Sequence, residues 1–281
     1  KKIIDGIIHN HKSNNQNFFI IFGNKNQIEP HITDKIAKEF YKIIHTENIV
    51  KSTDSPLEAA KRGKDTSMWL AINSVKNKEA DIVISAGNTG ALLVISKLNL
   101  KMIENIDKPA LSALWPNKKG MSVVLDLGAN IECNSKNLVD FSIMGASLYK
   151  SLYPNNAPKI ALLNIGSEEL KGNEIIKETF QILNEKKFKN FDFSGYIEGN
   201  QLMDGNVNVI ISDGFTGNVA LKTAEGTANF ITDELKIIFK GSILGKISAI
   251  LNYSNLNKFK KRLDPRLYNG AIFIGLDSPV V

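Results

Sequence analysis

Four times along the chain, an apolar strand runs into a loop that contains Gly and Asn, and a helix follows. The four loops are residues 85–90, 126–130, 164–174 and 212–218. In a parallel sheet every strand-to-helix loop lies at the same edge, so we expect the four loops to converge on one crevice. The alternation predicts an α/β fold: a three-layer α/β/α, Rossmann-like arrangement around a largely parallel sheet.

The composition of these loops suits an anionic ligand. Gly lets backbone N–H groups approach a ligand, a helix N-terminus favours an anion, and Asn amides donate and accept hydrogen bonds. Lys171, within the third loop, adds a cation that can bind phosphate as a point charge. Asp126 and Asp213 each begin a loop, where either can cap a turn or orient an Asn. We therefore predict a site for a phosphate or an acyl phosphate.

The absence of other motifs limits the chemistry. Neither GxGxxG with a downstream acid nor GxxxxGK[ST] is present. Cys133 is the only cysteine, which excludes an intrachain disulfide, and no His lies near it in the sequence, which disfavours a thiol nucleophile. Phosphate is itself a nucleophile, so acyl transfer to it needs only close positioning and donors for the tetrahedral oxyanion. The pattern favours direct displacement.

The remaining periodicity fits one α/β domain spanning residues 1–281. We expect helices over residues 3–8 and 30–45, from Ser55-Pro56, after residues 65–67, and after each of the four loops. Apolar runs predict strands over residues 18–22, 82–84, 123–125, 160–163, 193–197 and 207–211.

Residues 231–261 depart from this rhythm, because they interleave apolar side chains with Lys. We expect a protruding, basic amphipathic helical pair. It can pack against the body or a second subunit, or its apolar side chains can enter a membrane surface while Lys meets anionic lipid. On the second interpretation, the membrane contacts are Leu244, Ile247, Ile250 and Leu251.

The overall charge narrows the partners. A net charge of +6 and a pI of about 9.1 are typical of Lys-rich surfaces, and they also favour an acidic protein or an anionic lipid as partner. No basic–aromatic pattern is interleaved along the chain, so we expect no nucleic acid. A single cysteine fits a reducing cytoplasm, and no apolar run approaches the ~18 residues of a membrane span.

Several segments resemble the PlsX family of bacterial phosphate acyltransferases, in order and over essentially the whole chain. They are SAGNTGA (85–91), LDLGAN (125–130), LNIGSEE with KGNE (163–169 and 171–174), SDGFTGN with LKTAEG (212–218 and 221–226), and KRLD with YNGA (261–264 and 268–271). The resemblance implies transfer of a long-chain acyl group from acyl carrier protein to inorganic phosphate, giving an acyl phosphate for phospholipid synthesis.

The resemblance also implies a phosphotransacetylase- and isopropylmalate dehydrogenase-like architecture. It implies a homodimer attached peripherally to the inner face of the cytoplasmic membrane, and no metal or organic cofactor. Family members begin with a strand and an Asp-x-Met-Gly-Gly-Asp loop, and they continue into a Lys-x-His-Gly segment. Neither segment occurs in this chain, so the site that we assign here is incomplete.

Carried onto matching positions, the resemblance assigns three catalytic side chains. Lys171 binds phosphate or stabilises the oxyanion, and Asn218 and Asn88 hydrogen-bond the thioester carbonyl or the phosphate. The substrate-binding residues, which shape the pocket or let the backbone approach, are Gly87, Thr89, Gly90, Asn130, Gly172, Asn173, Asp213 and Gly217.

Three other functions are compatible with parts of the pattern. A phosphotransacetylase that uses acyl-CoA shares the loop chemistry, but the basic amphipathic segment favours an acidic carrier protein and a membrane. A non-catalytic phosphate- or nucleotide-binding module would bind without turnover. A dehydrogenase of related fold is disfavoured by the missing dinucleotide fingerprint.

Overall fold

The computed structural model describes residues 2–154, 157–263 and 270–281. The chain divides into two compact units: unit 1 comprises Lys1–Asn105 and Phe273–Val281, and unit 2 comprises Ile106–Ile272. The prediction of a single domain stays a prediction. Asp264, Tyr268 and Asn269, which belong to the last family motif, lie outside the described residues.

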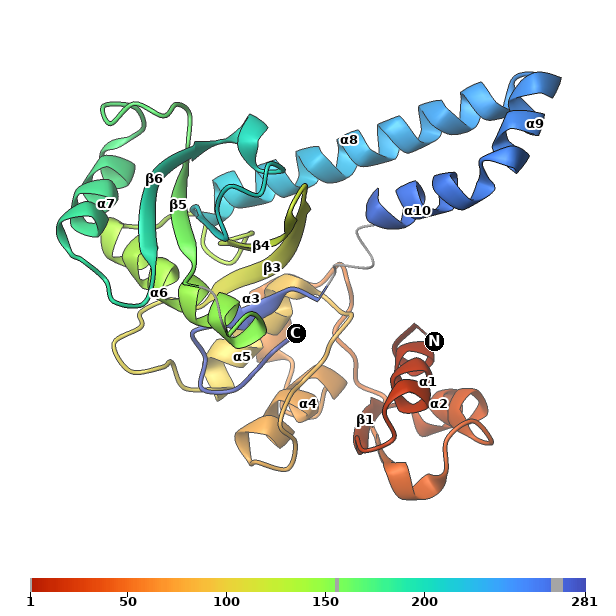
Figure 1. Cartoon of the computed structure of the whole chain (residues 1–281). Helices are drawn as coiled ribbons and strands as arrows, with labels where there is room; N and C mark the ends of the chain where they lie inside the picture. Colours follow the sequence, from red (N-terminus) through yellow and green to blue (C-terminus); the bar gives the residue numbers. More distant parts are fainter. Residues whose placement is uncertain (1, 155–156, 264–269) are drawn as a thin grey trace. The chain divides into compact units, whose positions relative to one another are not determined.

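Unit 2 is built on a mainly parallel sheet (Figure 1). Among the described residues of unit 2, the strand order is β6-β5-β7-β4-β3. Adjacent strands from β6 to β4 are parallel, and β3 pairs antiparallel with β4. The strands of this sheet are β3 (Ala110–Asn117), β4 (Gly120–Leu125), β5 (Lys159–Asn164), β6 (Asp192–Glu198) and β7 (Val209–Ile211). Strand β8 (Ile272–Ile274) begins at the last residue of unit 2 and continues in unit 1.

Helices cover both faces of this sheet. Alternate strand residues such as Val124 and Ile210 belong to a core that also contains Leu221 of α8 (Gly214–Lys240). On the other face, α6 (Ser135–Leu152) lies so close that a Cβ at Gly145 would come 2.6 Å from Cγ1 of Val209. α7 (Glu174–Glu185) packs against α6 and the strands beside it. The three-layer α/β/α prediction is confirmed.

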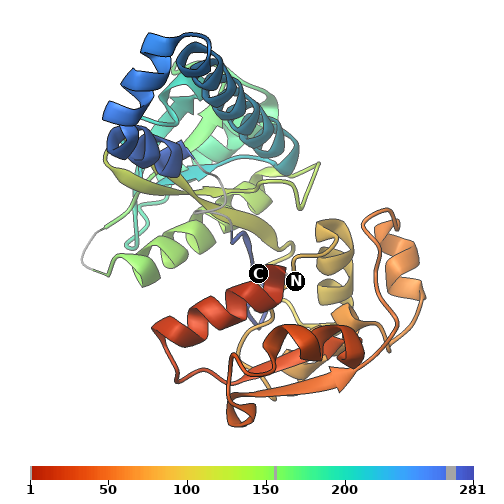
Figure 2. The same cartoon turned by 90° about the vertical axis from the view of Figure 1, so that its right-hand side faces the viewer.

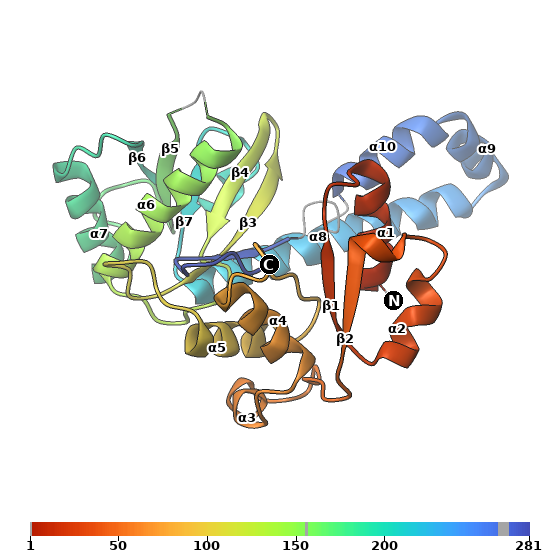
Figure 3. The same ribbon diagram turned by 90° about the horizontal axis from the view of Figure 1, so that it is seen from below.

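Unit 1 holds a small parallel pair, β1 (Phe19–Gly23) and β2 (Tyr41–His45), which Figure 3 shows side by side. Its core joins Ile4, Ile21, Ile32 and Ile36, which come from two helices, a strand and a loop. The helices are α1 (Lys2–Ser13), α2 (Lys25–Ile32), the 3-10 turn η1 (Lys38–Phe40), α3 (Pro56–Lys61), α4 (Ser67–Lys76) and α5 (Thr89–Asn99).

Two expectations about elements are wrong, and one strand was not predicted. The helix over residues 30–45 stops at Ile32, because Asp34 adopts a left-handed φ of 65°, and the β-branched run that follows forms β2. Residues 82–84 form no strand, since only Val83 makes an isolated bridge, to Val280. The sequence did not predict β3, which contains Pro116, a residue that usually interrupts strands.

The segment over residues 231–261 is helical, as predicted, but it comprises more than a pair. The end of α8 is followed by α9 (Ile243–Leu251) and α10 (Tyr253–Leu263). Figure 1 shows α8 running beyond the sheet, and Figure 2 turns α8, α9 and α10 toward the viewer. The α8–α9 corner is tight: a Cβ at Gly245 would lie 2.9 Å from the carbonyl oxygens of Ile238 and Phe239.

Candidate active site

The loop after β4 is organised by one buried carboxylate, that of Asp126. Asp126 is 0% exposed. Its Oδ1 accepts hydrogen bonds from the backbone N–H groups of Leu111, Gly128 and Ala129, at 3.0, 3.1 and 2.9 Å. Its Oδ2 accepts from the backbone N–H of Asn130 at 2.7 Å and from the Asn130 side-chain amide at 2.8 Å. This is the orienting role that we expected an Asp to play for an Asn.

Two opposed effects act on the pKa of this carboxylate. Burial raises the pKa of Asp126 above its ordinary value, because the charged form loses its hydration. The hydrogen bonds from Ala129, Asn130 and Leu111 work against that rise, because they favour the charged form.

The N-terminus of α8 is pressed onto this loop. The backbone N–H of Gly214 donates to the carbonyl oxygen of Asn130 at 2.8 Å. A Cβ at Gly217 would collide with the carbonyl oxygen of Asp126, so only Gly permits this approach. The side chain of Asn218 lies beside Gly128, about 3.6 Å from where a Cβ on that glycine would be. The structure therefore brings the second and fourth loops together.

Asp213 acts as the cap of α8. Its Oδ1 accepts from the backbone N–H of Thr216 and its Oδ2 from the Thr216 hydroxyl, both at 2.8 Å. Both carboxylate oxygens are thus used within the first helical turn. The geometry shows the capping that the sequence allowed for Asp213, and its predicted part in substrate binding stays a prediction.

The third loop is held by a side chain of β5. The Asn164 amide donates to the carbonyl oxygen of Lys171 at 3.1 Å, and Gly172 follows with a left-handed φ of 95°. Asn173 then caps α7, accepting from the backbone N–H of Ile176 at 2.9 Å. The Lys171 side chain is exposed and, among the described residues, its ammonium forms no ion pair. Glu174, three residues further along, forms an ion pair with Lys177 at 3.1 Å.

The third and fourth loops, together with residues 131–133 directly after the second loop, line a pocket of about 330 Å³ within unit 2. We call it the apolar pocket, because most of its lining is apolar. It is lined by Ile131, Glu132, Cys133, Leu138, Asn173, Ile175, Ile176, Asp213, Phe215 and Thr216. The predicted convergence holds for three of the four loops.

The remaining loop belongs to unit 1, with Gly87, Asn88, Thr89 and Gly90. Asn88 caps α5 by accepting from the backbone N–H of Ala91 at 3.0 Å. Its amide also donates to the carbonyl oxygen of Asp54 at 2.9 Å, and so holds a neighbouring loop. A Cβ at Gly90 would lie 2.8 Å from Cγ of Pro56. The contact of this loop with substrate stays a prediction.

Two residues near the apolar pocket, Cys133 and Lys108, have surroundings that the sequence alone does not show. Burial, followed by the nearby Asp126 charge, raises the pKa of the Cys133 thiol to about 11, which favours the neutral thiol at physiological pH. This supports a reaction without a thiol nucleophile.

Lys108, which sequence reasoning missed, donates from its ammonium to the carbonyl oxygen of Glu132 at 2.8 Å. Its position directly before Pro109 carries no recognisable signal.

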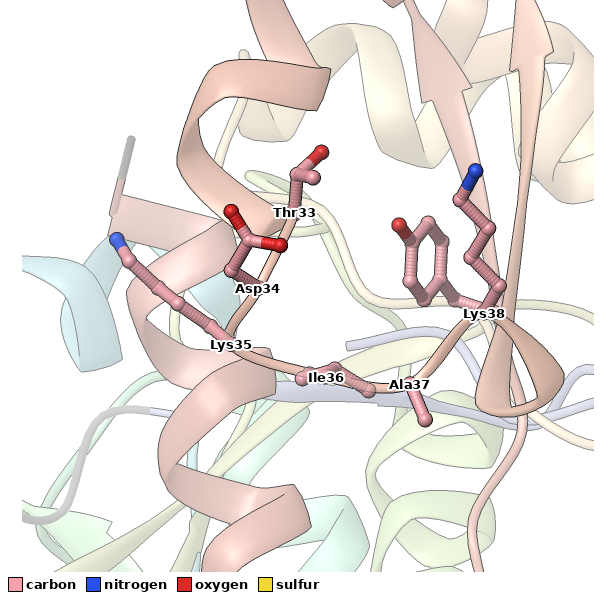
Figure 4. Close-up of a pocket in the computed structure, with 7 residues that line it drawn as sticks. Thr33, Asp34, Lys35, Ile36, Ala37 and Lys38 are labelled. Carbon is pink, nitrogen blue, oxygen red and sulfur yellow. The ribbon is translucent and has the colours of Figure 1, made fainter.

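A second pocket, of about 350 Å³, lies in unit 1 around the loop after α2. Figure 4 shows its lining, with the side chains of Lys35 and Lys38 pointing apart. None of the four predicted loops contributes to it, so we do not assign the reaction there. Among the described residues, no group of three or more His, Cys, Asp and Glu could hold a metal ion, and no helix is long and apolar enough to cross a bilayer.

The fold matches solved structures of acyl-transferring enzymes. A phosphotransacetylase from Streptococcus pyogenes superposes with a TM-score of 0.61 at 15% identity, covering 100% of this chain and 84% of that one. A branched-chain phosphotransacylase from Enterococcus faecalis gives 0.57 at 14% identity, covering 98% and 86%. The fold is therefore that of the phosphotransacetylase-like α/β class.

The sequence comparisons define the family. The family model described as "Fatty acid synthesis protein" matches residues 1–281. The phosphate acyltransferase of Pelagibacter ubique is 73% identical over 281 residues, which cover 100% of this chain and 84% of that protein. The phosphate acyltransferase of Maricaulis maris is 44% identical over 84% of this chain and 68% of that protein. The chain belongs to this family, the PlsX family, and it is a phosphate acyltransferase.

Proposed function

We propose that the acyl donor is a long-chain acyl-(acyl carrier protein) and that the product is an acyl phosphate for phospholipid synthesis. A phosphate oxygen attacks the thioester carbonyl carbon, and a tetrahedral oxyanion forms. The C–S bond then breaks, the acyl group stays on phosphate, and the carrier leaves as its thiol after taking up a proton. The meeting of three loops at the sheet edge of unit 2 is the observation that best supports this proposal.

The proposed roles follow from which groups are available. Lys171 attracts phosphate and stabilises the negative charge that develops on the carbonyl oxygen. Asn218 lies on the exposed side of the Asp126 loop, and its amide has no hydrogen-bond partner among the described residues, so it can contact the carbonyl or the phosphate. Asn88 would have to exchange its present partners for substrate.

The test is release of free carrier protein from long-chain acyl-carrier protein, with and without phosphate. We expect phosphate-dependent release with an acyl phosphate product, and a roughly hundredfold loss of kcat/KM in Lys171→Ala, on the order of one charge-assisted contact. Lys187→Ala, an equally exposed cation beyond α7, is the matched control. Faster turnover of acyl-CoA would favour the phosphotransacetylase alternative, and binding without release would favour the non-catalytic one.

We propose in addition that α8–α10 attach the protein peripherally to an anionic membrane at the cytoplasmic face. Large apolar side chains here are exposed, for example Leu244 at 77% and Leu251 at 80%, with Ile247 and Ile250 beside them. Lys246 lies among them on α9. Apolar insertion combined with Lys–lipid attraction fits such a surface.

Liposome co-sedimentation tests the attachment. Leu244→Glu with Ile247→Glu should abolish binding to vesicles that contain anionic lipid, whereas Leu98→Glu, an exposed leucine of unit 1, should not. Unchanged co-sedimentation of the double variant would refute the proposal.

We also propose a homodimer, since the same apolar helices can instead cover a second subunit. Sedimentation velocity distinguishes the two uses. If the Leu244→Glu and Ile247→Glu variant changes from dimer to monomer without lipid, this face is the dimer interface.

A further inference from the structure

The apolar pocket is lined by apolar and by polar side chains, and each kind limits which ligand can bind there. Its apolar members include Leu138, which is buried, and Phe215, Ile131 and Ile175 at the rim, which are 64%, 73% and 38% exposed. Exposed apolar surface gathered around a cavity marks a binding site more often than scattered apolar residues do. The ligand is therefore expected to bring apolar surface of its own.

The polar members of the lining do not offer an anion site. Asn173 and the Asp213–Thr216 pair are already engaged as helix caps. The charged lining residues are the carboxylates Glu132 and Asp213, and no Lys or Arg is among the lining residues. Phosphate would be repelled here, because like charges at short range disfavour binding. The inorganic phosphate must be recognised elsewhere at this edge.

We infer that the apolar pocket receives the aliphatic tail of the acyl group, with Phe215 and Ile175 as the residues that read its length. This inference rests on the proposed function, since that function supplies a ligand with a polar reacting end and a long apolar tail. The pocket begins at the helix N-termini that carry Asn173 and Asp213, so a tail can enter it while the thioester stays among the loops. A volume of about 330 Å³ suits part of a chain.

Binding of alkylphosphonates with four, eight and twelve carbons tests this directly. They are stable, non-reacting relatives of an acyl phosphate, so calorimetry measures affinity without turnover. In the wild type we expect Kd to fall about fourfold for each methylene that enters the pocket, until the pocket is full. The Phe215→Ala and Ile175→Ala double variant should reduce this to less than about twofold per methylene, with butylphosphonate affinity nearly unchanged.

The chain offers matched controls on the same kinds of helix. Phe230 on α8 is 65% exposed and Ile143 on α6 is 36% exposed, and neither lines the pocket. Phe230→Ala with Ile143→Ala should keep the wild-type dependence on chain length. Both pairs remove comparable exposed apolar surface, so a difference between them reports the pocket.

Several outcomes would overturn the inference. A Phe215→Ala and Ile175→Ala variant with the wild-type slope, or with equal losses at every chain length, would show that these side chains do not contact the tail. A change of sedimentation coefficient to that of a smaller species would show that they cover a second copy of the chain. If the slope behaves as expected but no carrier is released from acyl-carrier protein, the pocket stands and the proposed function fails.

Discussion

Gly217 and Gly226 lie nine residues apart on α8 but in opposite surroundings. A Cβ at Gly217 would collide with the backbone carbonyl oxygen of Asp126 and would come 2.6 Å from Oγ of Ser212. Neither partner can turn away, because the carbonyl oxygen is backbone and the Ser212 hydroxyl already donates to it, at 3.3 Å. A Cβ at Gly226 would meet nothing within 4 Å. The same substitution should therefore change stability with opposite sign at the two positions.

The magnitudes follow from two terms. Gly→Ala in a helix interior gains about 1 kcal/mol in unfolding free energy, and this should be the whole effect of Gly226→Ala. At Gly217 the collision forces α8 away from the end of β4, and overpacking of a rigid site costs about 3 kcal/mol. We expect Gly217→Ala to lose about 2 kcal/mol net, which leaves a difference of about 3 kcal/mol between the variants.

Urea unfolding followed by tryptophan fluorescence measures this difference, in a Trp69→Phe background that leaves Trp115 as the emitting tryptophan. Trp115 is buried in the core that includes Leu221 of α8, so its signal reports this packing. Equal unfolding free energies for Gly217→Ala and Gly226→Ala would refute the steric argument. Gly217→Ala should also lower turnover, because the Asn218 amide moves with the displaced turn.

Three further predictions concern single groups. Burial raises the pKa of the Asp126 carboxyl in the folded protein above 3.8, so the protonated carboxyl stabilises the fold below about pH 4 and this stabilisation is lost as pH rises through the folded pKa. The unfolding free energy of the wild type relative to Asp126→Asn should therefore increase as pH falls from 7 to 4. A difference in unfolding free energy that stays constant over this range would contradict the prediction. Iodoacetamide labelling of Cys133 in the native protein should rise only toward pH 11, and mass spectrometry showing half-maximal labelling near pH 8.5 would contradict its burial. Gly172→Ala should raise the KM for phosphate, because a φ of 95° disfavours any residue with a side chain and the new Cβ would lie 2.6 Å from the Asn164 side-chain oxygen. Gly199→Ala, where a Cβ would have open space around it, should leave this KM unchanged.

The local signals in the sequence predicted much of the fold because they act over a few residues. Ser55-Pro56 begins α3, and Asn88, Asn173 and Asp213 cap the helices that follow the predicted loops. The wrong predictions of helices and strands arise where pairing with a segment distant in the sequence determines the secondary structure. Residues 41–45 carry apolar side chains compatible with either element, and pairing with β1 makes them a strand. Residues 82–84 look like a strand but pair only at Val83.

The sequence predicted which residues belong to the candidate site, but it predicted few of the hydrogen bonds between them. The sequence indicates that Asp126 can orient an Asn, but it carries no sign that Leu111, from the far side of the β3–β4 hairpin, also donates to the same carboxylate. Lys108 and the apolar pocket also depend on tertiary contacts. Such groups come together only after the sheet has formed, and no local pattern encodes them.

The structure also changes what the glycines of these loops do. We expected their backbone N–H groups to approach a ligand. In the described residues, the N–H groups of Gly128 and Ala129 instead donate to Asp126, and that of Gly214 donates to Asn130. A donor already paired with a buried carboxylate gives up a charge-assisted hydrogen bond if it turns to a substrate, which costs about 1.5–3 kcal/mol.

Gly214 and Gly217 therefore serve mainly to let α8 and the Asp126 loop touch, and the ligand must be bound by polar groups that these contacts leave unpaired. Among the described residues of the loops of unit 2, the Asn218 amide has no hydrogen-bond partner, and the exposed Lys171 ammonium forms no ion pair. These are two of the side chains that the family pattern assigns to catalysis. The hydrogen bonds of Asp126 fix the loop beside Asn218, and the Asn164 amide fixes the backbone at Lys171. The unpaired polar groups of both side chains can therefore contact a substrate without breaking those bonds.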